Sequence, residues 1–200
     1  MVAYTIFPKT HCLVAHHGEI LPRTNDTLVT FIERQHIFFT GSAAASGRVN
    51  LSPKGMDSLR VLDMQHVAYL DLTGSGNETA AHILHDGRLT LMFCSFEEDP
   101  LILRLYGKGR AVRPRDQDWP GLQAKFPDLP GKRQIIELTI DSVQTSCGWA
   151  VPKFAYQSER EMMARWVEKK GKQGVIDYWR EKNRSSIDGL PTGLFAEEVL

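Results

Sequence analysis

The sequence is short of cysteine and of long apolar stretches, and each shortage excludes a class of protein. Its cysteines, Cys12, Cys94 and Cys147, are odd in number and widely spaced, which fits neither a disulfide framework nor a zinc site. No run approaches the ~18 apolar residues that span a bilayer, and the N-terminus lacks the basic start and apolar core of a secretory signal. We therefore expect a cytoplasmic protein without a membrane anchor.

Net charge is also lacking. The 24 lysines and arginines balance 24 aspartates and glutamates, which leaves a formal net charge of +0. Proteins that bind nucleic acid broadly carry a basic surface, so no nucleic-acid partner is expected. An anion bound by this chain must be met by a local site.

Length and composition predict one folded unit. The chain has 200 residues, of which 42% are hydrophobic, and this is enough to bury a sizeable core. We expect a single domain over residues 1–200. Its core barrel would lie at about 25–156, followed by a helical extension at about 157–200.

The pattern up to residue 146 is mainly that of β-strands. A short helix is expected at 25–36, where apolar residues recur at helical spacing after a cap at Thr24 or Asn25. Six or so strands with few helices between them favour a mainly β fold, a β-barrel with flanking helices. The strands are expected within 37–72, 88–94, 101–112 and 133–146.

Two helices are expected in the last quarter of the chain. Ser158 and Glu161 have the spacing of a capping box ahead of one apolar helical face, and Val175, Ile176 and Trp179 supply a second. The basic stretch between these faces, KKGKQG, is interpreted as a solvated helix end and not as a nucleic-acid patch.

The stretch DLTGSGNETAAHIL (71–84) joins an apolar strand to a helix through two glycines. Thr79 stands where a dinucleotide fingerprint needs its third glycine, and the G-x-x-x-x-G-K-[ST] phosphate loop is absent. Two interpretations stay open. The loop presents the N–H groups of a helix start to a phosphate, or Ser75 and Glu78 form a capping box that only starts the helix.

Two strand segments favour a phosphate-bearing ring. Arg48, Asn50 and Ser52 alternate onto one face of a strand that ends at the cation Lys54. Arg104, Tyr106 and Lys108 share a face of a later strand (103–110) in the same way. Each segment alone is typical of an exposed strand face, whereas both together with GSGNET indicate a bound phosphorylated aromatic cofactor.

These segments resemble the pyridoxamine 5'-phosphate oxidase-like flavoproteins, which have the FMN-binding split-barrel fold. The resemblance covers roughly residues 25–156 and implies a homodimer that holds FMN in the clefts between its subunits. The features that carry it are the S-P-K-G turn (52–55), the Y-L-D-L-T-G-S-G-N-E-T junction (69–79), the L-R-L-Y-G-K-G-R strand (103–110) and S-C-G-W-A-V-P (146–152).

The resemblance also implies which side chains meet the cofactor. Strand residues 48–52 would line the isoalloxazine ring, Lys54 and Thr73 would reach the ribityl phosphate, and 77–79 would occupy the phosphate-binding helix start. The true oxidase has a basic pair where this chain has Glu78-Thr79, and Trp149 either stacks near the flavin or fills the interface. The cofactor-binding residues implied are Arg48, Val49, Asn50, Leu51, Ser52, Lys54, Thr73, Asn77, Glu78, Thr79 and Trp149.

The implied activity is flavin-mediated hydride transfer from a nicotinamide or another small donor. The cofactor supplies that reactivity, so no side chain is assigned a catalytic role. The oxidase's R-x-H-x-R substrate signature is absent after Trp149, and oxidation of vitamin B6 is not expected. The alternatives are a non-enzymatic module that binds or senses flavin, heme or a deazaflavin, and a cofactor-free dimeric scaffold.

Other reactive side chains favour ordinary roles. His82 and His85 lie three apart on the helix after the glycines, and His16 and His17 are adjacent, but neither pair has the further ligands that a metal needs. No metal site is expected, and His82 is expected to be exposed or to face the phosphate. Cys94 and Cys147 lie in apolar strands, where buried and unreactive thiols are usual.

Overall fold

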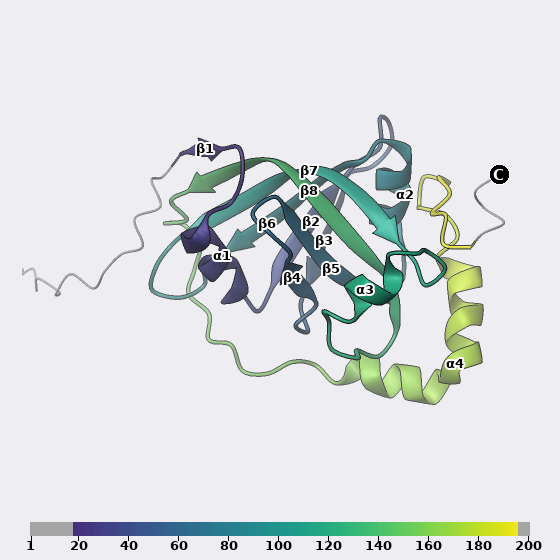
Figure 1. The fold of residues 1–200 in the computed structure, drawn as a ribbon. Coiled ribbons are helices and arrows are strands. Elements are labelled where there is room, and N and C mark those ends of the chain that lie inside the picture. Colours follow the sequence, from purple (N-terminus) through teal and green to yellow (C-terminus); the bar gives the residue numbers. More distant parts are fainter. Residues whose placement is uncertain (1–17, 196–200) are drawn as a thin grey trace, which may run out of the picture.

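The computed structural model describes residues 18–195, and the expectations for Cys12, His16 and His17 lie outside them. The chain forms one curved antiparallel sheet with the strand order β3-β2-β6-β7-β8-β5-β4, while β1 pairs with β8 (Figure 1). The strands are β1 (Ile20–Leu21), β2 (Phe38–Ser42), β3 (Asn50–Lys54), β4 (Leu59–Val61), β5 (His66–Leu72), β6 (Arg88–Cys94), β7 (Ile102–Val112) and β8 (Lys132–Ser146).

The sheet is open at one seam. Its edge strands β3 and β4 are consecutive in the chain, yet each pairs with only one other strand within the described residues. The short turn 55–58 that joins them contains Met56 and Asp57, both in the left-handed region with φ of 62° and 52°. Such values are uncommon for residues other than glycine, so this turn is a tight and specific one.

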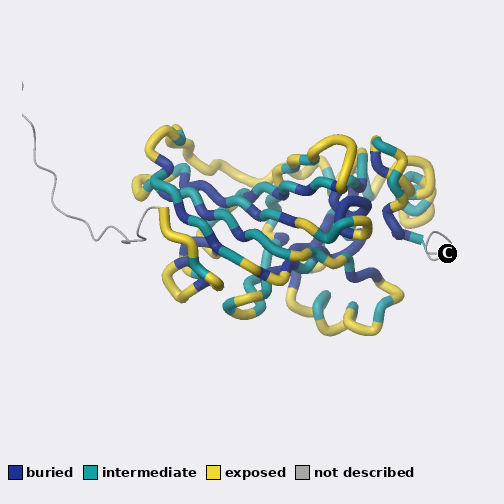
Figure 2. Tube along the Cα trace, turned by 90° about the horizontal axis from the view of Figure 1, so that it is seen from above, coloured by how far each residue is buried: buried dark blue, intermediate teal, exposed yellow. Residues whose placement is uncertain are grey.

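Burial along β8 follows its sequence. Ile136, Leu138 and Ile140 are at most 2% exposed, whereas the alternate residues Thr139 and Asp141 face solvent. This alternation confirms a sheet with one wet face, because successive side chains of a strand point to opposite sides. Figure 2 shows that the strands are mainly buried or intermediate, whereas many of the connections between them are exposed.

Four helices flank the sheet within residues 18–195. Asn25 caps the first by accepting a hydrogen bond from Leu28 N at 2.9 Å, which confirms the predicted cap. The five-residue helix that covers the smaller apolar cluster around Phe126 was not expected from the sequence. The helices are α1 (Asp26–Glu33), α2 (Glu78–His85), α3 (Trp119–Gln123) and α4 (Met162–Lys182).

The two predicted C-terminal helices are the two arms of α4. Gly171, at φ 66° and ψ 166°, breaks the helical geometry inside this element. The predicted capping box is wrong, because α4 starts after Glu161 without a side-chain cap and Ser158 lies in the irregular segment before it. The second arm brings the chain to the end of the sheet that carries α2 (Figure 1). No helix in the described residues is long and apolar enough to cross a membrane.

Candidate functional site

A cavity of about 950 Å³ lies between β3, the end of β5, the start of α2 and the segment that follows α4. Nine of the eleven cofactor residues implied by the sequence line it, although they come from strands and loops that are far apart along the chain. The nine are Arg48, Val49, Asn50, Ser52, Lys54, Thr73, Asn77, Glu78 and Thr79.

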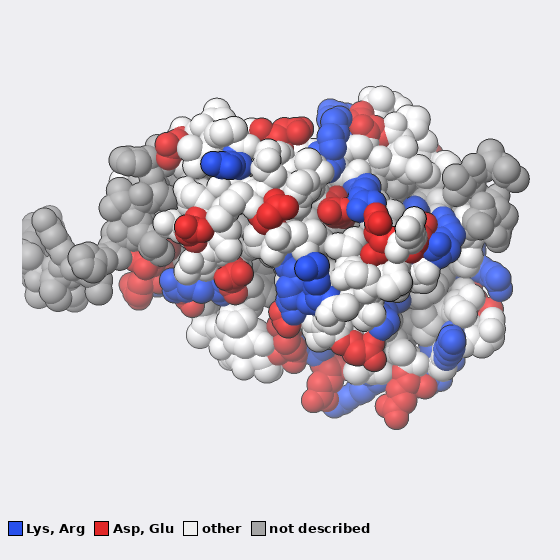
Figure 3. Space-filling model, in the orientation of Figure 1, with Lys and Arg blue, Asp and Glu red and all other residues white. Residues whose placement is uncertain are grey.

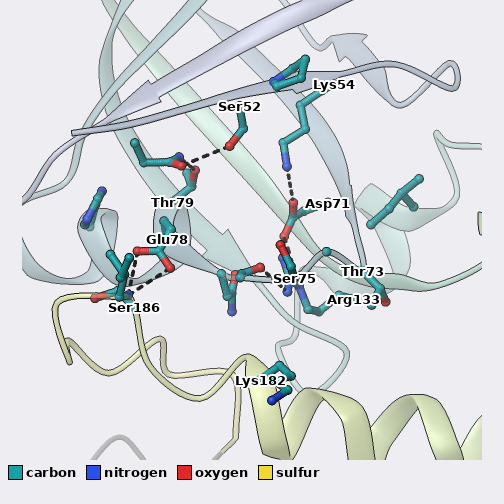
Figure 4. A pocket seen from close by; sticks show the side chains of 18 of the residues that line it. Ser52, Lys54, Asp71, Thr73, Ser75, Glu78, Thr79, Arg133, Lys182 and Ser186 are labelled. Carbon is teal, nitrogen blue, oxygen red and sulfur yellow. Dashed lines mark hydrogen bonds and ion pairs between the residues drawn. The ribbon is translucent and has the colours of Figure 1, made fainter. Parts of the chain in front are cut away.

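One wall of the cavity holds a buried ion-pair network. Arg133 Nη2 donates to Asp71 Oδ2 at 2.7 Å, and Lys54 Nζ donates to Asp71 Oδ1 at 3.1 Å (Figure 4). Burial raises the pKa of the Asp71 carboxyl, but the charges of Arg133 and Lys54 outweigh that effect and hold the pKa well below its usual range. Asp71 is therefore ionised, and its charge is shared by two cations.

The two cations differ in what they can still bind. Arg133 also donates to Gly76 O at 3.1 Å and to Asn183 Oδ1 at 2.8 Å, so most of its guanidinium is occupied. The side chain of Lys54 is 23% exposed, and its ammonium group has donors beyond the one that Asp71 uses. Two cations and one carboxylate leave this network with one positive charge in excess, which an anionic ligand next to Lys54 would balance.

The glycine junction is held in place by its carbonyl groups. Gly76 O accepts from Arg133, and Gly74 O accepts from Asn183 Nδ2 at 3.1 Å. The first N–H groups of α2 have no partner within the helix and are available at the cavity. With these two carbonyls bonded within the protein, the N–H groups at the start of α2 are the donors without a partner in this part of the described chain, and such donors favour an anion.

The side chains of two predicted phosphate ligands, Thr73 and Asn77, are already hydrogen-bonded within the protein. Thr73 Oγ1 donates to Gly131 O at 2.7 Å and accepts from Trp179 Nε1 at 2.8 Å. Asn77 Oδ1 accepts from Gln134 Nε2 at 2.7 Å. Both side chains therefore fix the loop against its surroundings. The backbone N–H of Thr73 is also used within the protein, because it donates to Gly131 O at 2.8 Å.

Glu78 contradicts one of the two interpretations of the glycine junction, the capping box. Its two carboxylate oxygens each accept from Ile187 N at 3.1 Å, so the negative charge turns toward the C-terminal segment (Figure 4). Asn77 and not Ser75 is the N-cap of α2, and it makes no side-chain capping bond, so the capping box predicted for Ser75 and Glu78 does not form. The carboxylate is hydrogen-bonded to the C-terminal segment, but Glu78 still lines the cavity and its charge stays near the start of α2.

The β3 side of the cavity is lined by neutral polar groups. Ser52 Oγ donates to Asn50 Oδ1 at 3.1 Å, and Asn50 Nδ2 donates to Thr79 Oγ1 at 3.2 Å. These residues lie on the half-buried face of β3, whereas Leu51 on the opposite face is 68% exposed and does not line the cavity. An amide and hydroxyl surface of this kind suits the polar edge of a planar ring.

Trp149 lies away from the cavity of its own chain. It is 76% exposed and follows the end of β8, whereas Arg133 is at the start of that strand. A strand of 15 residues spans up to about 50 Å at ~3.3 Å per residue. A contact between Trp149 and a cofactor would therefore require a second copy of the chain.

The strand face formed by Arg104, Tyr106 and Lys108 of β7 does not line the cavity. A bulge follows Tyr106, so the simple alternation expected from the sequence is broken there. Arg104 donates to Ser146 Oγ at 3.1 Å and Tyr106 to Gln144 Oε1 at 2.9 Å, both on neighbouring β8. The expectation that this face contributes to the same site is wrong for a single chain.

The sequence interpretation missed residues that complete the cavity. No sequence motif predicted Arg133. Asp71 could have indicated such a residue, because a carboxylate in a buried apolar strand needs a cation as its partner. The C-terminal residues that form one wall of the cavity could not be predicted from the sequence, because they are more than a hundred positions away from the residues they contact. Its lining residues are Glu181, Lys182, Ser185, Ser186 and Ile187.

The histidines of α2 do not form a metal site. No group of His, Cys, Asp and Glu side chains within residues 18–195 could hold a metal ion. His85 is exposed. Of the two alternatives expected for His82, exposure is wrong, because this residue is only 2% exposed and lines the cavity. Cys94 is buried, which raises the pKa of its thiol and agrees with an unreactive role.

Charge on the molecular surface is mixed. In the face that Figure 3 shows, acidic and basic side chains are interspersed, without an extended patch of one sign. This agrees with the balanced composition of the chain. The excess positive charge described above is a feature of the cavity and not of the surface as a whole.

The sequence of this chain is similar to those of known proteins. A family model described as pyridoxamine 5'-phosphate oxidase matches residues 24–147. The pyridoxamine 5'-phosphate oxidase family protein ustO of Aspergillus flavus is 36% identical over 185 residues, which cover 84% of this chain and 74% of that protein.

A solved structure supports the fold, and a second one has a slightly lower TM-score. HupZ of Group A Streptococcus has a TM-score of 0.50 at 14% identity, covering 66% of this chain and 100% of that chain. A putative pyridoxamine 5'-phosphate oxidase from Lactobacillus delbrueckii has a TM-score of 0.49 at 21% identity, covering 62% and 94%. The chain belongs to the pyridoxamine 5'-phosphate oxidase family and has a mainly β, split-barrel fold.

Proposed function

We propose that the chain binds FMN in the cavity and acts as a flavin-dependent oxidoreductase. The observation that carries the proposal is the buried Lys54–Asp71–Arg133 network with its excess positive charge, next to the free N–H groups of a helix start. A phosphate dianion is stabilised by this combination of a partly exposed ammonium group and backbone donors. Family membership supports a flavin as the molecule that carries the phosphate.

The chain's residues divide into three roles toward such a cofactor. Lys54, the N–H groups near Thr79 and the hydroxyl of Thr79 would hold the phosphate. The polar face of β3, with Asn50 and Ser52, would orient the ring, and Arg133 would keep Asp71 and the glycine junction in position. When bound, FMN supplies two-electron chemistry, in which it takes a hydride from a donor and later passes the electrons on.

Oxidation of a pyridoxal-type substrate is not proposed. The R-x-H-x-R signature of the oxidase is missing from residues 149–200, and the sequence has no histidine after His85. The wall that this chain builds from residues 181–187 instead carries serine hydroxyls and Lys182. The donor is therefore another small molecule.

A homodimer is part of the proposal. Leu51, on the outer face of the edge strand β3, is 68% exposed. Val49, which precedes this strand, and Trp149 are 77% and 76% exposed. Exposed apolar side chains of this size are typical of an interface. A partner subunit over β3 would close the cavity and could bring its own Trp149 to it.

The first experiment is an absorbance spectrum of the purified protein with mass analysis of the released small molecule. FMN in the released fraction, and bleaching of its absorbance by a nicotinamide donor, would support the oxidoreductase. A bound flavin that no donor reduces would favour a binding or sensing role. A colourless protein that does not bind added FMN would contradict the proposal.

A further inference from the structure

His82 is a buried imidazole for which the family resemblance gives no role. It lies in the second turn of α2, three residues after Thr79, and lines the cavity while being only 2% exposed. Its Nδ1 is 3.1 Å from Ser42 Oγ, a hydroxyl that is also buried. Within residues 18–195 this is the one hydrogen bond of the ring, so Nε2 has no partner in this part of the chain.

The surrounding polar groups favour one tautomer of the ring. Ser42 Oγ lies 3.5 Å from Thr79 Oγ1, to which its proton can be donated, and Thr79 Oγ1 also accepts from Asn50 Nδ2 at 3.2 Å. With its proton directed to Thr79, the Ser42 oxygen accepts from Nδ1–H of His82. The lone pair of the neutral imidazole is then on Nε2, where a base that serves the cavity must have it.

The charged groups around α2 are paired with other residues. Asp188 is the carboxylate that interacts with His82 electrostatically, and it is held by Arg48. Glu78 accepts from Ile187 N, and His85 on the same helix is exposed. On the neighbouring strands, Arg88 of β6 and Lys108 of β7 both contact Asp86.

We propose that His82, positioned by Ser42, is the base that takes a proton from the donor in this cavity. The inference rests on the proposed function, which supplies flavin as the oxidant. In the donor, the C–H bond breaks and its electron pair leaves with the hydrogen as hydride to the flavin. The adjacent O–H or N–H bond breaks, its proton goes to His82 Nε2, and a C=O or C=N bond forms.

This step defines a class of donor. A reduced nicotinamide gives up a hydride and releases no proton, so it has no need of a base. An alcohol or amine with a hydrogen on the adjacent carbon must lose both a hydride and a proton. The position of His82 therefore indicates that the physiological donor is an alcohol or amine of this kind.

The test measures the transfer of a proton from a probe to the protein and does not require catalytic turnover. The FMN-loaded protein is mixed with para-nitrophenol at a pH where the free probe is neutral, and the phenolate absorbance and the protons released to solvent are both measured. We expect phenolate to form in the wild type without release of a proton, because the proton moves to His82. Lys54 could stabilise a phenolate, but its ammonium group, which pairs with Asp71, has no lone pair to accept the proton.

Two variants complete the experiment. His82→Gln should lose phenolate formation while binding FMN, and His85→Gln, an exposed position on the same helix, should behave as the wild type does. In ¹⁵N spectra, the His82 ring of the wild type should be protonated at Nδ1. A wild type that leaves the probe neutral, releases one proton for each phenolate formed, or is matched by His82→Gln would overturn the inference, as would protonation at Nε2.

FMN affinity, measured on the same samples, separates this inference from the function it rests on. If wild type and His82→Gln bind FMN equally and neither takes up the proton, the inference alone fails. If the wild type does not bind FMN at all, the proposed function fails with it.

Discussion

Arg133 and Asp71 form an ion pair of 2.7 Å in which the two side chains are only 3% and 5% exposed. Their strands are adjacent, and the backbone of Asp71 is in register with that of Gln134, the next residue after Arg133. The sheet itself therefore brings the carboxylate to the cation. The pair connects the barrel to the glycine junction and to the end of α4, because Arg133 also binds Gly76 and Asn183.

Replacing Asp71 should destabilise the protein strongly. Asp71→Asn leaves Arg133 without its buried counter-ion, and breaking a buried pair in this way costs about 3–5 kcal/mol of the free energy of unfolding. Chemical denaturation of the two proteins at neutral pH measures the difference. Arg110, whose pairs with Asp118 and Glu137 are more exposed, offers a control, since Asp118→Asn should cost at most about 1 kcal/mol.

The cost of Asp71→Asn should also depend on pH. The pKa of Asp71 is lower in the folded protein than in the unfolded chain, where it is about 3.9. The stability that this carboxylate contributes is therefore fully present above about pH 4–5 and is lost as the pH falls below that range. Unfolding measured from neutral to acid pH should show the two proteins converging, and a difference that stays constant would contradict the assignment.

Lys54 and Thr79 should contribute directly to FMN binding. Each of Lys54→Ala and Thr79→Ala removes a hydrogen bond to the phosphate and should weaken binding by about 1–3 kcal/mol. Lys170→Ala is the matched control, since this exposed lysine of α4 lies outside the cavity. Fluorescence titration of FMN gives the three dissociation constants, and equal values in all three variants would refute the phosphate site.

Trp179 should stabilise the loop that carries Thr73. Its indole N–H donates to Thr73 Oγ1 at 2.8 Å, which joins the second arm of α4 to the cavity wall. Trp179→Phe keeps most of the apolar surface and loses this bond, so the free energy of unfolding should fall by about 1 kcal/mol. Trp166→Phe is the comparison, because its ring packs on Tyr178 and its N–H has no partner in residues 18–195. Equal stability in both variants would argue against the bond.

Gly107 should tolerate no side chain. A Cβ at this position, beside the β7 bulge, would lie 1.9 Å from Thr139 O, so β7 and β8 would have to separate. Gly107→Ala should cost about 3 kcal/mol or prevent folding. Gly121→Ala is the control, since nothing lies within 4 Å of its Cβ position, and thermal unfolding compares the two. A Gly107→Ala protein as stable as this control would contradict the close approach of the two strands.

Much of the barrel was predictable because the signals are local. The cap at Asn25 and the alternation of Ile136, Leu138 and Ile140 follow from residues a few positions apart, and the structure confirms both. The grouping of Lys54 with Thr79 around one cavity came from the family resemblance, and the structure places both residues on its wall.

The remainder depends on contacts between distant parts of the chain. Glu78 has capping-box spacing, yet its carboxylate binds Ile187, because a partner from the C-terminal segment is available only in the folded chain. The Ser158 capping box fails for a related reason, since helix starts are set by packing as well as by local sequence. The burial of His82 likewise depends on the strands around α2, which its spacing from His85 does not reveal.

The most direct test of the central claim compares FMN with riboflavin, which has the same ring and no phosphate. Calorimetric titration of each into the ligand-free protein, with Lys54→Ala alongside, isolates the contribution of the phosphate. We predict that the wild type binds FMN more tightly than riboflavin by about 1–3 kcal/mol or more, and that Lys54→Ala reduces this difference. Equal affinity for the two molecules, or no binding of either, would contradict a phosphate-binding cavity built around Lys54.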